Sequence, residues 1–294
     1  MENRMDQANK LRDMLNRTKP ETAAARAARV IAVTSGKGGV GKTNFTVNLA
    51  LYLQSQGVRV VVVDADFGLA NIEILLGVAP QFTLADVISN NYTIDQVITE
   101  HESGLRFVSG GSGLSILANV DKANVGLIVD KLAELDAIAD VILIDTGAGI
   151  SESVLQFVIA ADETIVICVP EPTSITDAYS LIKSTKERTI DIPKFKIVVN
   201  RAENKEEGLE IHKNLQRVSV KFLSINLEYL GVIPSDPNLV RAVKKQSPCL
   251  LTFPNSVFAT EITNIGMKIM DISKSKESAG MKGFMRRLIN IFNK

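Results

Sequence analysis

The sequence predicts an α/β fold, with a doubly wound, mainly parallel sheet and helices on both of its faces. Short β-branched runs recur between about residues 29 and 235, helical stretches lie between them, and a glycine-rich loop directly follows the first run. Most of the runs are continuously apolar, which is typical of strands that are covered on both faces. Strand, helix, strand in this rhythm builds right-handed crossovers, and ligands of such sheets bind outside the carboxyl ends of the strands.

The expected strands are Val30–Ser35, Val58–Asp64, Leu105–Ser109, Asp140–Asp145, Thr164–Val169, Phe195–Asn200 and Leu230–Ile233. The expected helices include Lys42–Gln56, Asp121–Leu135, Ser151–Ala160, Ser174–Arg188 and Lys205–Val220. Two flanks depart from this alternation. Residues 1–28 combine a polar, helix-like segment with an Ala/Arg tether, and the small polar stretch 274–282 leads to a different kind of sequence. We therefore expect an N-terminal segment (1–28), a core domain (29–273) and a C-terminal linker and helix (274–294).

Composition narrows the class of protein. The 294 residues include 33 Lys+Arg and 33 Asp+Glu, so the neutral chain is not expected to bind nucleic acid through its overall charge. Cys168 and Cys249 offer neither zinc spacing nor a disulfide framework, which fits a reducing compartment. The N-terminus lacks the apolar region of a signal peptide, and no apolar run reaches the roughly 18 residues of a membrane span. The sequence therefore favours a cytoplasmic protein.

The strongest motif is the loop GKGGVGKT at residues 36–43, between an expected strand and an expected helix. It satisfies the phosphate-binding pattern GxxxxGK[ST] in the strand–loop–helix context that the pattern requires. Its glycines allow successive backbone N–H groups to curl around a phosphate. Lys42 is expected to reach the outer phosphates, and the Thr43 hydroxyl to join the Mg²⁺ shell. The expected nucleotide-binding residues here are Gly36, Lys37, Gly38, Gly39, Val40, Gly41, Lys42, Thr43 and Asn44.

The second lysine of this loop, Lys37, makes it a deviant P-loop, and in this the chain resembles the MinD/ParA ATPases. The resemblance implies a P-loop fold of MinD type that binds ATP and Mg²⁺. It also implies that Lys37 crosses a homodimer interface to the partner's phosphates, as an arginine finger does. Two positions depart from the family pattern: Asn44 stands where many relatives carry Thr or Ser, and Gly147 stands where MinD has Pro.

Carboxylates follow two of the expected strands. Asp64 to Asn71 (DADFGLAN) resembles the family's switch I, and Asp145 to Gly149 (DTGAG) resembles its switch II. The resemblance implies that Asp66 activates the attacking water, with Lys37 and Lys42 as the other catalytic residues. It implies Thr43, Asp64 and Asp145 as the metal site, the two carboxylates acting through water or from the second shell. The alternative role for each carboxylate is a helix N-cap, which is common at strand-to-helix turns.

Recognition of the base is expected from residues late in the chain. In MinD-like ATPases the ends of the last two strands clasp adenine, which here implies Asn200, Arg201, Pro234 and Asp236. A GTPase would carry NKxD after the first of these strands. Residues 200–203 read NRAE instead, so adenine is favoured.

The C-terminal segment from Met281 to Lys294 places bulky apolar residues on one arc of a helix and basic residues on the rest. This pattern is typical of a helix that lies in a membrane interface, and it resembles a MinD-type membrane-targeting helix. The residues expected to contact an anionic membrane are Phe284, Met285, Leu288, Ile289, Ile291 and Phe292. The alternative is a terminal helix that packs on its own domain, and the two states can alternate with the bound nucleotide.

The N-terminal segment DQANKLR at residues 6–12 precedes this core, and in this combination the chain resembles the FlhG (YlxH) flagellar-number regulators. In that family the segment activates FlhF, a GTPase of SRP type. The residues that would act on this partner are Asp6, Gln7, Leu11 and Arg12, where Gln7 can order a water and Arg12 can reach charge. The alternative is an ordinary amphipathic terminus.

These features together predict a slow ATP hydrolase that regulates flagellar number or placement. ATP is expected to close a homodimer that associates peripherally with the membrane, and flagellar switch or C-ring components are candidate further partners. A positioning ATPase for division, DNA or cargo partition stays open, as does a scaffold that binds ATP without turnover. A neutral chain disfavours direct DNA binding. Because Cys168 lies inside an expected strand, an Fe–S carrier is disfavoured as well.

Overall fold

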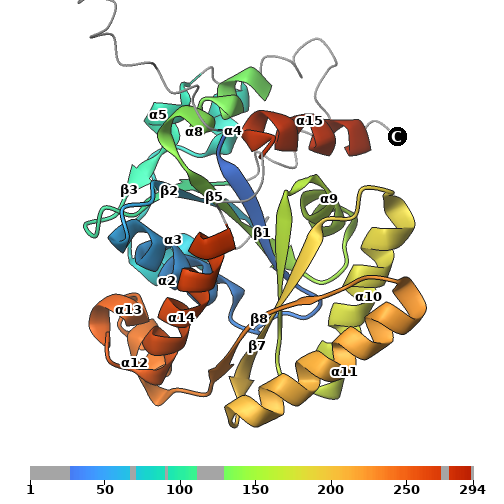
Figure 1. The fold of residues 1–294 in the computed structure, drawn as a ribbon. Coiled ribbons are helices and arrows are strands. Elements are labelled where there is room, and N and C mark those ends of the chain that lie inside the picture. The colour runs from blue at the N-terminus through green and yellow to red at the C-terminus, as the bar shows by residue number, and fades with distance from the viewer. Residues whose placement is uncertain (1–26, 67–70, 90–91, 111–128, 273–277, 293–294) are drawn as a thin grey trace, which may run out of the picture.

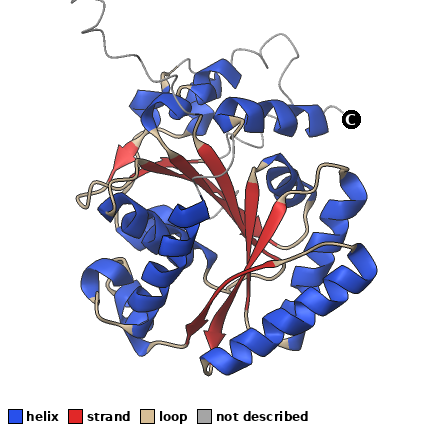
Figure 2. Ribbon diagram, in the orientation of Figure 1, coloured by secondary structure: helices blue, strands red, loops and turns tan. Residues whose placement is uncertain are grey.

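The computed structural model describes residues 27–66, 71–89, 92–110, 129–272 and 278–292. An eight-stranded sheet with the order β3-β4-β2-β5-β1-β6-β7-β8 runs through the middle of the molecule, and helices cover both of its faces (Figures 1 and 2). The strand pairs are parallel except for β3 with β4, which are antiparallel. The doubly wound, mainly parallel α/β fold is therefore confirmed.

The strands are β1 (Arg29–Ser35), β2 (Val60–Ala65), β3 (Thr99–Glu100), β4 (Arg106–Ser109), β5 (Val141–Ala148), β6 (Glu163–Cys168), β7 (Lys194–Ala202) and β8 (Glu228–Pro234). Each expected strand is present, with ends shifted by a few residues. The two-residue edge strand β3 was not expected, because Thr-Glu carries no apolar pattern. Every residue of β2 and β6 is buried, which explains why these strands read as continuous apolar runs.

The helices are α2 (Lys42–Ser55), α3 (Asn71–Leu76), α4 (Leu84–Ser89), α5 (Ile94–Val97), α8 (Leu135–Ile138), α9 (Glu152–Ala160), α10 (Pro172–Arg188), α11 (Lys205–Leu223), α12 (Pro237–Lys244), α13 (Cys249–Thr252), α14 (Val257–Ile272) and α15 (Gly280–Phe292). Four of the expected helices correspond to α2, α9, α10 and α11. Of the expected helix 121–135, residues 121–128 lie outside the described ranges and residues 129–133 are helical.

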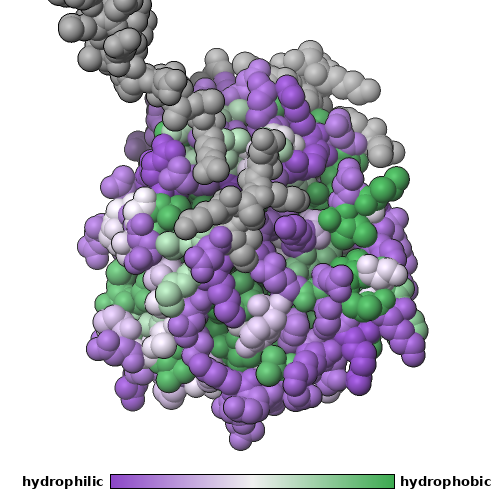
Figure 3. All heavy atoms as spheres, viewed as in Figure 1, coloured by the Kyte–Doolittle hydropathy of each residue, from purple (hydrophilic) through white to green (hydrophobic). Residues whose placement is uncertain are grey.

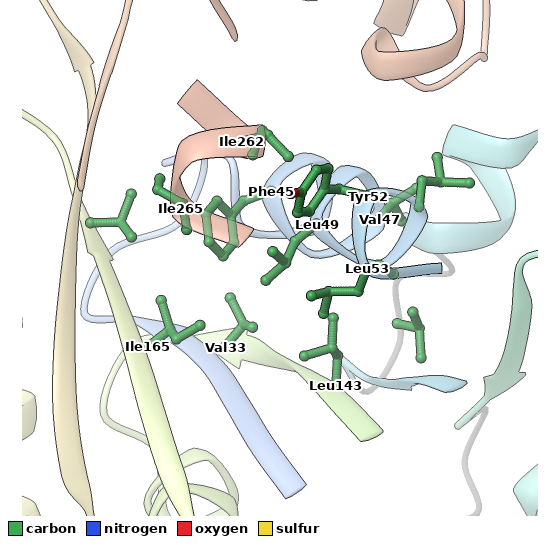
Figure 4. Packing of buried hydrophobic residues seen from close by; sticks show 14 of the residues in the cluster. Val33, Phe45, Val47, Leu49, Tyr52, Leu53, Leu143, Ile165, Ile262 and Ile265 are labelled. Atoms are coloured by element: carbon green, nitrogen blue, oxygen red, sulfur yellow. The ribbon is translucent and has the colours of Figure 1, made fainter. Parts of the chain in front are cut away.

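One face of the sheet is covered by α2 and α14. Phe45, Leu49 and Leu53 of α2 point toward the strands, and Ile262 and Ile265 of α14 close the same layer (Figure 4). All five side chains are at most 1% exposed. This layer holds α2 firmly against the sheet, and α2 begins at the end of the glycine-rich loop. The loop is therefore placed by the largest apolar cluster around it.

The C-terminal helix α15 packs on the other face of the sheet, beside α8 and α9 (Figure 1). Its apolar side chains Met281, Phe284, Met285, Leu288 and Ile289 are at most 7% exposed. The ring of Phe284 stacks on Phe157 of α9, with centroids 6.1 Å apart. Ile291 is half-buried, and the side chain of Phe292 lies outside the described structure. The structure thus shows the packed alternative for the apolar face that was expected to meet a membrane.

The visible surface is mainly hydrophilic, with separate hydrophobic patches (Figure 3). No helix in the described ranges is long and apolar enough to cross a membrane. The residues expected to act on a partner GTPase, Asp6, Gln7, Leu11 and Arg12, lie outside the described residues.

Candidate functional site

The glycine-rich loop connects β1 to α2 at the carboxyl end of the sheet. Gly36 lies against α10, where a Cβ would come within 2.3 Å of the backbone carbonyl carbon of Asp177, so this position admits only glycine. Gly41 precedes α2 with φ +95°, in the left-handed region that favours glycine. Around Gly39, which has φ +75°, a Cβ would meet nothing within 4 Å. The loop is therefore tightly anchored at both ends and open at its middle, as a phosphate cradle must be.

The first turn of α2 presents polar groups beneath this loop. The Thr43 hydroxyl donates to Asp145 Oδ2 at 2.7 Å, and the Thr46 hydroxyl is 3.0 Å from Asp145 Oδ1. Lys42 is buried, yet its Nζ donates no hydrogen bond to a described residue. The Oδ1 atom of Asn44 is buried without a partner among the described residues. An ammonium without a partner among the described residues and an orphaned amide oxygen at a helix N-terminus fit a bound nucleotide, because unpaired buried polar groups are costly.

Two buried carboxylates meet beside this turn. Asp64 on β2 and Asp145 on β5 are direct neighbours in the strand register. Burial is the main cause that raises the pKa of Asp64 to about 7, and the nearby Asp145 adds to the shift. Burial likewise raises the pKa of Asp145 to about 6, against the opposing effects of Thr43, Lys42 and Thr46. Since two carboxylates share one desolvated place, this cluster favours a cation.

The donors present suit Mg²⁺ in the manner of P-loop sites. Thr43 would supply a direct oxygen, and Asp64 and Asp145 would hold the ion from behind, leaving positions for phosphate oxygens and water. The described residues contain no group of three His, Cys, Asp or Glu side chains that could hold a metal ion. The bound ion would neutralise phosphate charge. The expected metal residues are thus brought together, while their ligation stays a prediction.

Asp66 lies just beyond the end of β2, with its side chain between the two switch segments. Its backbone N–H donates to Asp64 Oδ1 at 3.0 Å, and the side-chain amide of Asn71 donates to Asp66 Oδ2 at 2.9 Å. A Cβ at Gly147, in switch II, would lie 3.3 Å from Asp66 Oδ1. The motif placed Asp66 near the site, whereas its neighbours became visible only in the fold.

Lys37 has a role within its own protomer, which the sequence did not reveal. Its Nζ pairs with Glu171 Oε2 at 2.5 Å and lies 3.2 Å from Thr173 Oγ1. Both partners lie where β6 leads into α10 and are exposed. In this structure Lys37 therefore pairs within its own protomer with a loop 134 residues away, while its contact with a partner's phosphates stays a prediction.

The four residues expected to clasp adenine lie at the ends of β7 and β8, where they also have structural roles. Asn200 Nδ2 donates to the carbonyl of Val40 at 2.7 Å, which braces the glycine-rich loop. Arg201 follows with φ +56°. Pro234 ends β8, and Asp236 caps α12 through Asn238 N and also accepts from Phe258 N. Their contacts with a base stay a prediction.

Comparison with known proteins decides the family. The model of the CobQ/CobB/MinD/ParA nucleotide-binding domain matches residues 31–249. The chain belongs to this family. It is 40% identical to the antiactivator FleN of Pseudomonas aeruginosa over 241 residues, covering 82% of this chain and 86% of FleN. It is 32% identical to the flagellum site-determining protein YlxH of Helicobacter pylori over 294 residues, covering 97% of this chain and 98% of YlxH, so that match extends into both tails.

Solved structures agree on the fold. The MinD cell division ATPase of Pyrococcus furiosus superposes with a TM-score of 0.66 at 25% identity, covering 83% of this chain and 99% of that protein. MinD of Pyrococcus horikoshii, solved in complex with Mg-ADP, gives a TM-score of 0.68 at 24% identity, covering 85% of this chain and 99% of that protein. The chain is thus a MinD-like nucleotide-binding protein of FleN and FlhG type.

Proposed function

We propose that this protein is an ATP-switched regulator of flagellar number or placement. The proposal rests mainly on the deviant P-loop, which contains Lys37 and Lys42 and lies beside the Asp64–Asp145 pair. It is supported by the similarity of the chain to FleN and YlxH along most of its length. ATP closes a homodimer, and slow hydrolysis resets it. In this cycle Lys42 and the loop amides bind phosphate, Asp66 orients water, and Lys37 moves from Glu171 to the partner's phosphates.

The dimer associates with anionic membrane through α15. Its apolar arc is buried on the sheet in the monomer, so the helix must leave this place before the same side chains can enter a bilayer. A single short amphipathic helix binds membranes weakly, and two helices on one dimer gain avidity. Membrane binding is thereby expected to depend on ATP.

The N-terminal segment acts on a partner GTPase of SRP type, FlhF in the terms of the family. Gln7 can orient a water in trans, as the catalytic Gln of small GTPases does in cis, and Leu11 can dock in a groove. A peptide of residues 1–25 should stimulate GTP hydrolysis by the partner, and Gln7→Ala should abolish the effect. Equal rates with both peptides, or no stimulation by either, would leave this segment a tether.

The decisive measurement for the whole proposal is ATP turnover with and without anionic liposomes. We expect slow turnover that requires Asp66 and co-sedimentation with liposomes that requires ATP. Turnover without membrane binding would favour the alternative of a positioning ATPase for DNA or cargo partition. ATP binding without turnover would favour a scaffold that senses ATP.

A further inference from the structure

Switch I contains an amide that holds the carboxylate of Asp66. Asn71 begins α3 five residues after Asp66, and its Nδ2 donates to Asp66 Oδ2 at 2.9 Å. The next residue, Ile72, lies with its backbone N–H 3.4 Å from Asp64 Oδ2. The start of α3 therefore contacts both carboxylates of switch I, and it fixes one oxygen of Asp66.

The other oxygen of Asp66 faces switch II. A Cβ built on Gly147 would lie 3.3 Å from Asp66 Oδ1 and 3.8 Å from its Cγ. Within the described ranges Oδ1 receives no hydrogen bond, so it is the oxygen that can accept one from water. Because Gly147 has no side chain, the two switches can approach this closely. A larger residue at position 147 would be in tight contact with the Asp66 carboxylate.

We propose that Asn71 is a positioning residue for ATP hydrolysis. By donating to Oδ2 it stops the carboxylate from rotating and leaves Oδ1 as the acceptor for the attacking water. Hydrogen bonds to a charged acceptor are among the stronger ones in proteins, so one amide suffices to select the orientation. The inference rests on the proposed ATPase activity, and it adds a residue whose contribution acts only through Asp66.

The test compares Asn71→Ala with Asn264→Ala. The control removes a bond of the same kind, from the amide of Asn264 to Glu261 on α14, at 3.2 Å and away from the site. We expect Asn71→Ala to lower kcat by roughly 10- to 100-fold without changing KM or nucleotide affinity, because a misplaced reacting group costs rate and not binding. The ATP-bound dimer should persist longer by a similar factor, which is measured by size exclusion after dilution into ADP.

Two outcomes would overturn this inference. Unchanged kcat in Asn71→Ala would mean that the amide does not position Asp66. A parallel loss of nucleotide affinity and thermal stability would mean that Asn71 only holds the local structure. If Asp66→Ala also leaves turnover unchanged, the assigned role of Asp66 itself fails. Absence of ATP turnover in the wild type would refute the proposed hydrolysis, so the failures are distinguishable.

A second, independent observation concerns the place where both tails leave the core. Asp136 of α8 accepts hydrogen bonds from the backbone of Met281 at 2.7 Å and of Lys282 at 3.2 Å, at the start of α15. Its Oδ1 also accepts from Ala28 N at 3.2 Å, one residue before β1. A single carboxylate thus anchors the C-terminal helix and the root of the N-terminal segment.

A second carboxylate repeats this arrangement. Asp162 Oδ2 lies 2.6 Å from the hydroxyl of Ser278 and accepts from Val30 N at 3.1 Å. Its Oδ1 accepts from Arg287 of α15 at 2.9 Å. The Ser278 hydroxyl is also 2.7 Å from the carbonyl oxygen of Ala28. If α15 leaves, residues 28–30 lose shared contacts at both anchors.

The geometry points to coupling between the two tails: release of α15 loosens the root of the N-terminal segment, and a partner that binds this segment favours release of α15. Such coupling is reciprocal, because each event changes the free energy of the other by the same amount. This inference rests on the proposed membrane and partner roles for its use in the cell. The coupling itself needs neither membrane nor partner.

Hydrogen exchange of the intact protein tests it. Arg287→Ala removes the hydrogen bonds of α15 to Ala160 and Asp162 without removing a hydrogen bond of residues 28–30, and Lys282→Ala is the control because its ion pair with Asp130 is exposed. We expect the amides of Ala28 and Val30 to exchange at least roughly threefold faster in Arg287→Ala, together with that of Met281, and to stay unchanged in the control. Faster exchange at Met281 alone would refute the coupling.

Wild-type protein with ATP and anionic liposomes provides the second arm. Faster exchange of the Ala28 amide when the protein binds liposomes supports coupling between membrane binding by α15 and the root of the N-terminal segment. Liposome binding without any change at Ala28 refutes it. Absence of liposome binding refutes the proposed membrane role, while the Arg287→Ala result still decides the coupling.

Discussion

At the scale of single residues, Glu171 competes for the lysine that a partner protomer is expected to need. The Lys37–Glu171 pair is exposed on both sides, so its contribution is small, about 0.5 kcal/mol. Even so, it must break before Lys37 can reach across an interface. The Lys37–Glu171 pair of the monomer therefore makes dimer formation slightly less favourable.

We predict that Glu171→Gln dimerises with ATP at a roughly fivefold lower protein concentration than the wild type, because about 0.5 kcal/mol of competition is removed from each protomer, or about 1 kcal/mol per dimer. Sedimentation velocity over a concentration series measures this shift. Glu187→Gln, in the exposed pair with Lys183, is the matched control and should leave the midpoint unchanged. A higher midpoint for Glu171→Gln would show that Glu171 supports the dimer.

The desolvated Asp145 makes the stability of the nucleotide-free protein depend on pH. Its pKa rises from the ordinary 3.8 to about 6 through burial, so between these values the folded protein keeps a proton that the unfolded chain has lost. The free energy of unfolding falls as pH rises across this window, and the full penalty remains above it. Asp145 therefore destabilises the empty site at neutral pH.

We predict that Asp145→Asn raises the Tm of the nucleotide-free protein by about 2–5 °C at neutral pH, with the difference vanishing toward acid pH. The isosteric amide can still bond to the hydroxyls of Thr43 and Thr46. Differential scanning fluorimetry across pH measures the effect, with the exposed Asp191→Asn as control. A Tm below that of the wild type at neutral pH would contradict the assigned cause.

At the scale of elements, an ionic cluster with a buried centre connects four strands near their amino ends. Glu163 of β6 pairs with Arg29 of β1 at 2.6 Å and with Lys196 of β7 at 3.2 Å, and Lys196 reaches Glu228 of β8 at 3.0 Å. The Lys196 side chain is only 1% exposed. Against the effect of burial, the bonds and charges of Arg29 and Lys196 hold the pKa of Glu163 below its ordinary value.

We predict that Glu163→Gln lowers the free energy of unfolding by about 3 kcal/mol, because it leaves two cations with less compensation in a desolvated place. Chemical denaturation measures it. The control is Glu210→Gln in the exposed pair with Lys213, which should cost less than about 0.5 kcal/mol. Equal small losses in both variants would mean that water reaches the cluster.

The outer face of α15 offers a way to test membrane contact without disturbing the core. Arg286 is exposed, whereas the apolar residues that would enter a bilayer also hold the helix on its domain. We predict that Arg286→Ala lowers affinity for anionic liposomes by about fivefold per helix, since a basic residue near such a surface contributes about 1 kcal/mol. Thermal stability should stay within error of the wild type.

Co-sedimentation with ATP measures this affinity, and Arg241→Ala on the exposed side of α12 is the matched control. Identical binding by both variants would mean that α15 does not face the membrane. Deletion of residues 281–294 is the coarser test and should abolish binding. It also uncovers the apolar face of α9 around Phe157, so its folding must be checked first.

At the scale of the whole molecule, different groups of residues lie at the carboxyl and the amino ends of the strands. The residues expected to bind phosphate, metal and water gather at the carboxyl ends of the strands, while α15, the root of the N-terminal segment and the ionic cluster lie toward the amino ends. A dimer that closes over the carboxyl ends of the strands would leave the surface at their amino ends free to contact a membrane and a partner protein. This arrangement agrees with the proposed switch.

We predict that Asp66→Ala forms a persistent dimer with ATP, because phosphate and metal contacts remain while the water-orienting carboxylate is lost. Lys37→Ala should bind nucleotide and stay monomeric, since the charge supplied in trans is missing. Light scattering coupled to size exclusion at saturating ATP distinguishes the two. If Asp66→Ala stays monomeric at saturating ATP, the proposed dimeric ATP state is wrong.

The sequence by itself determined the α/β class, the positions of the main strands along the chain, the phosphate-binding loop and the carboxylates at the strand ends. These features can be recognised from short stretches of sequence, because a strand buried on both faces is a continuous apolar run and a phosphate-binding loop has a fixed spacing between its strand and its helix. Only the tertiary structure decided that Glu171 meets Lys37, that Asn71 holds Asp66, and where the apolar face of α15 lies. The physical reason is that an amphipathic pattern requires one face to leave water without specifying whether a core or a bilayer receives it.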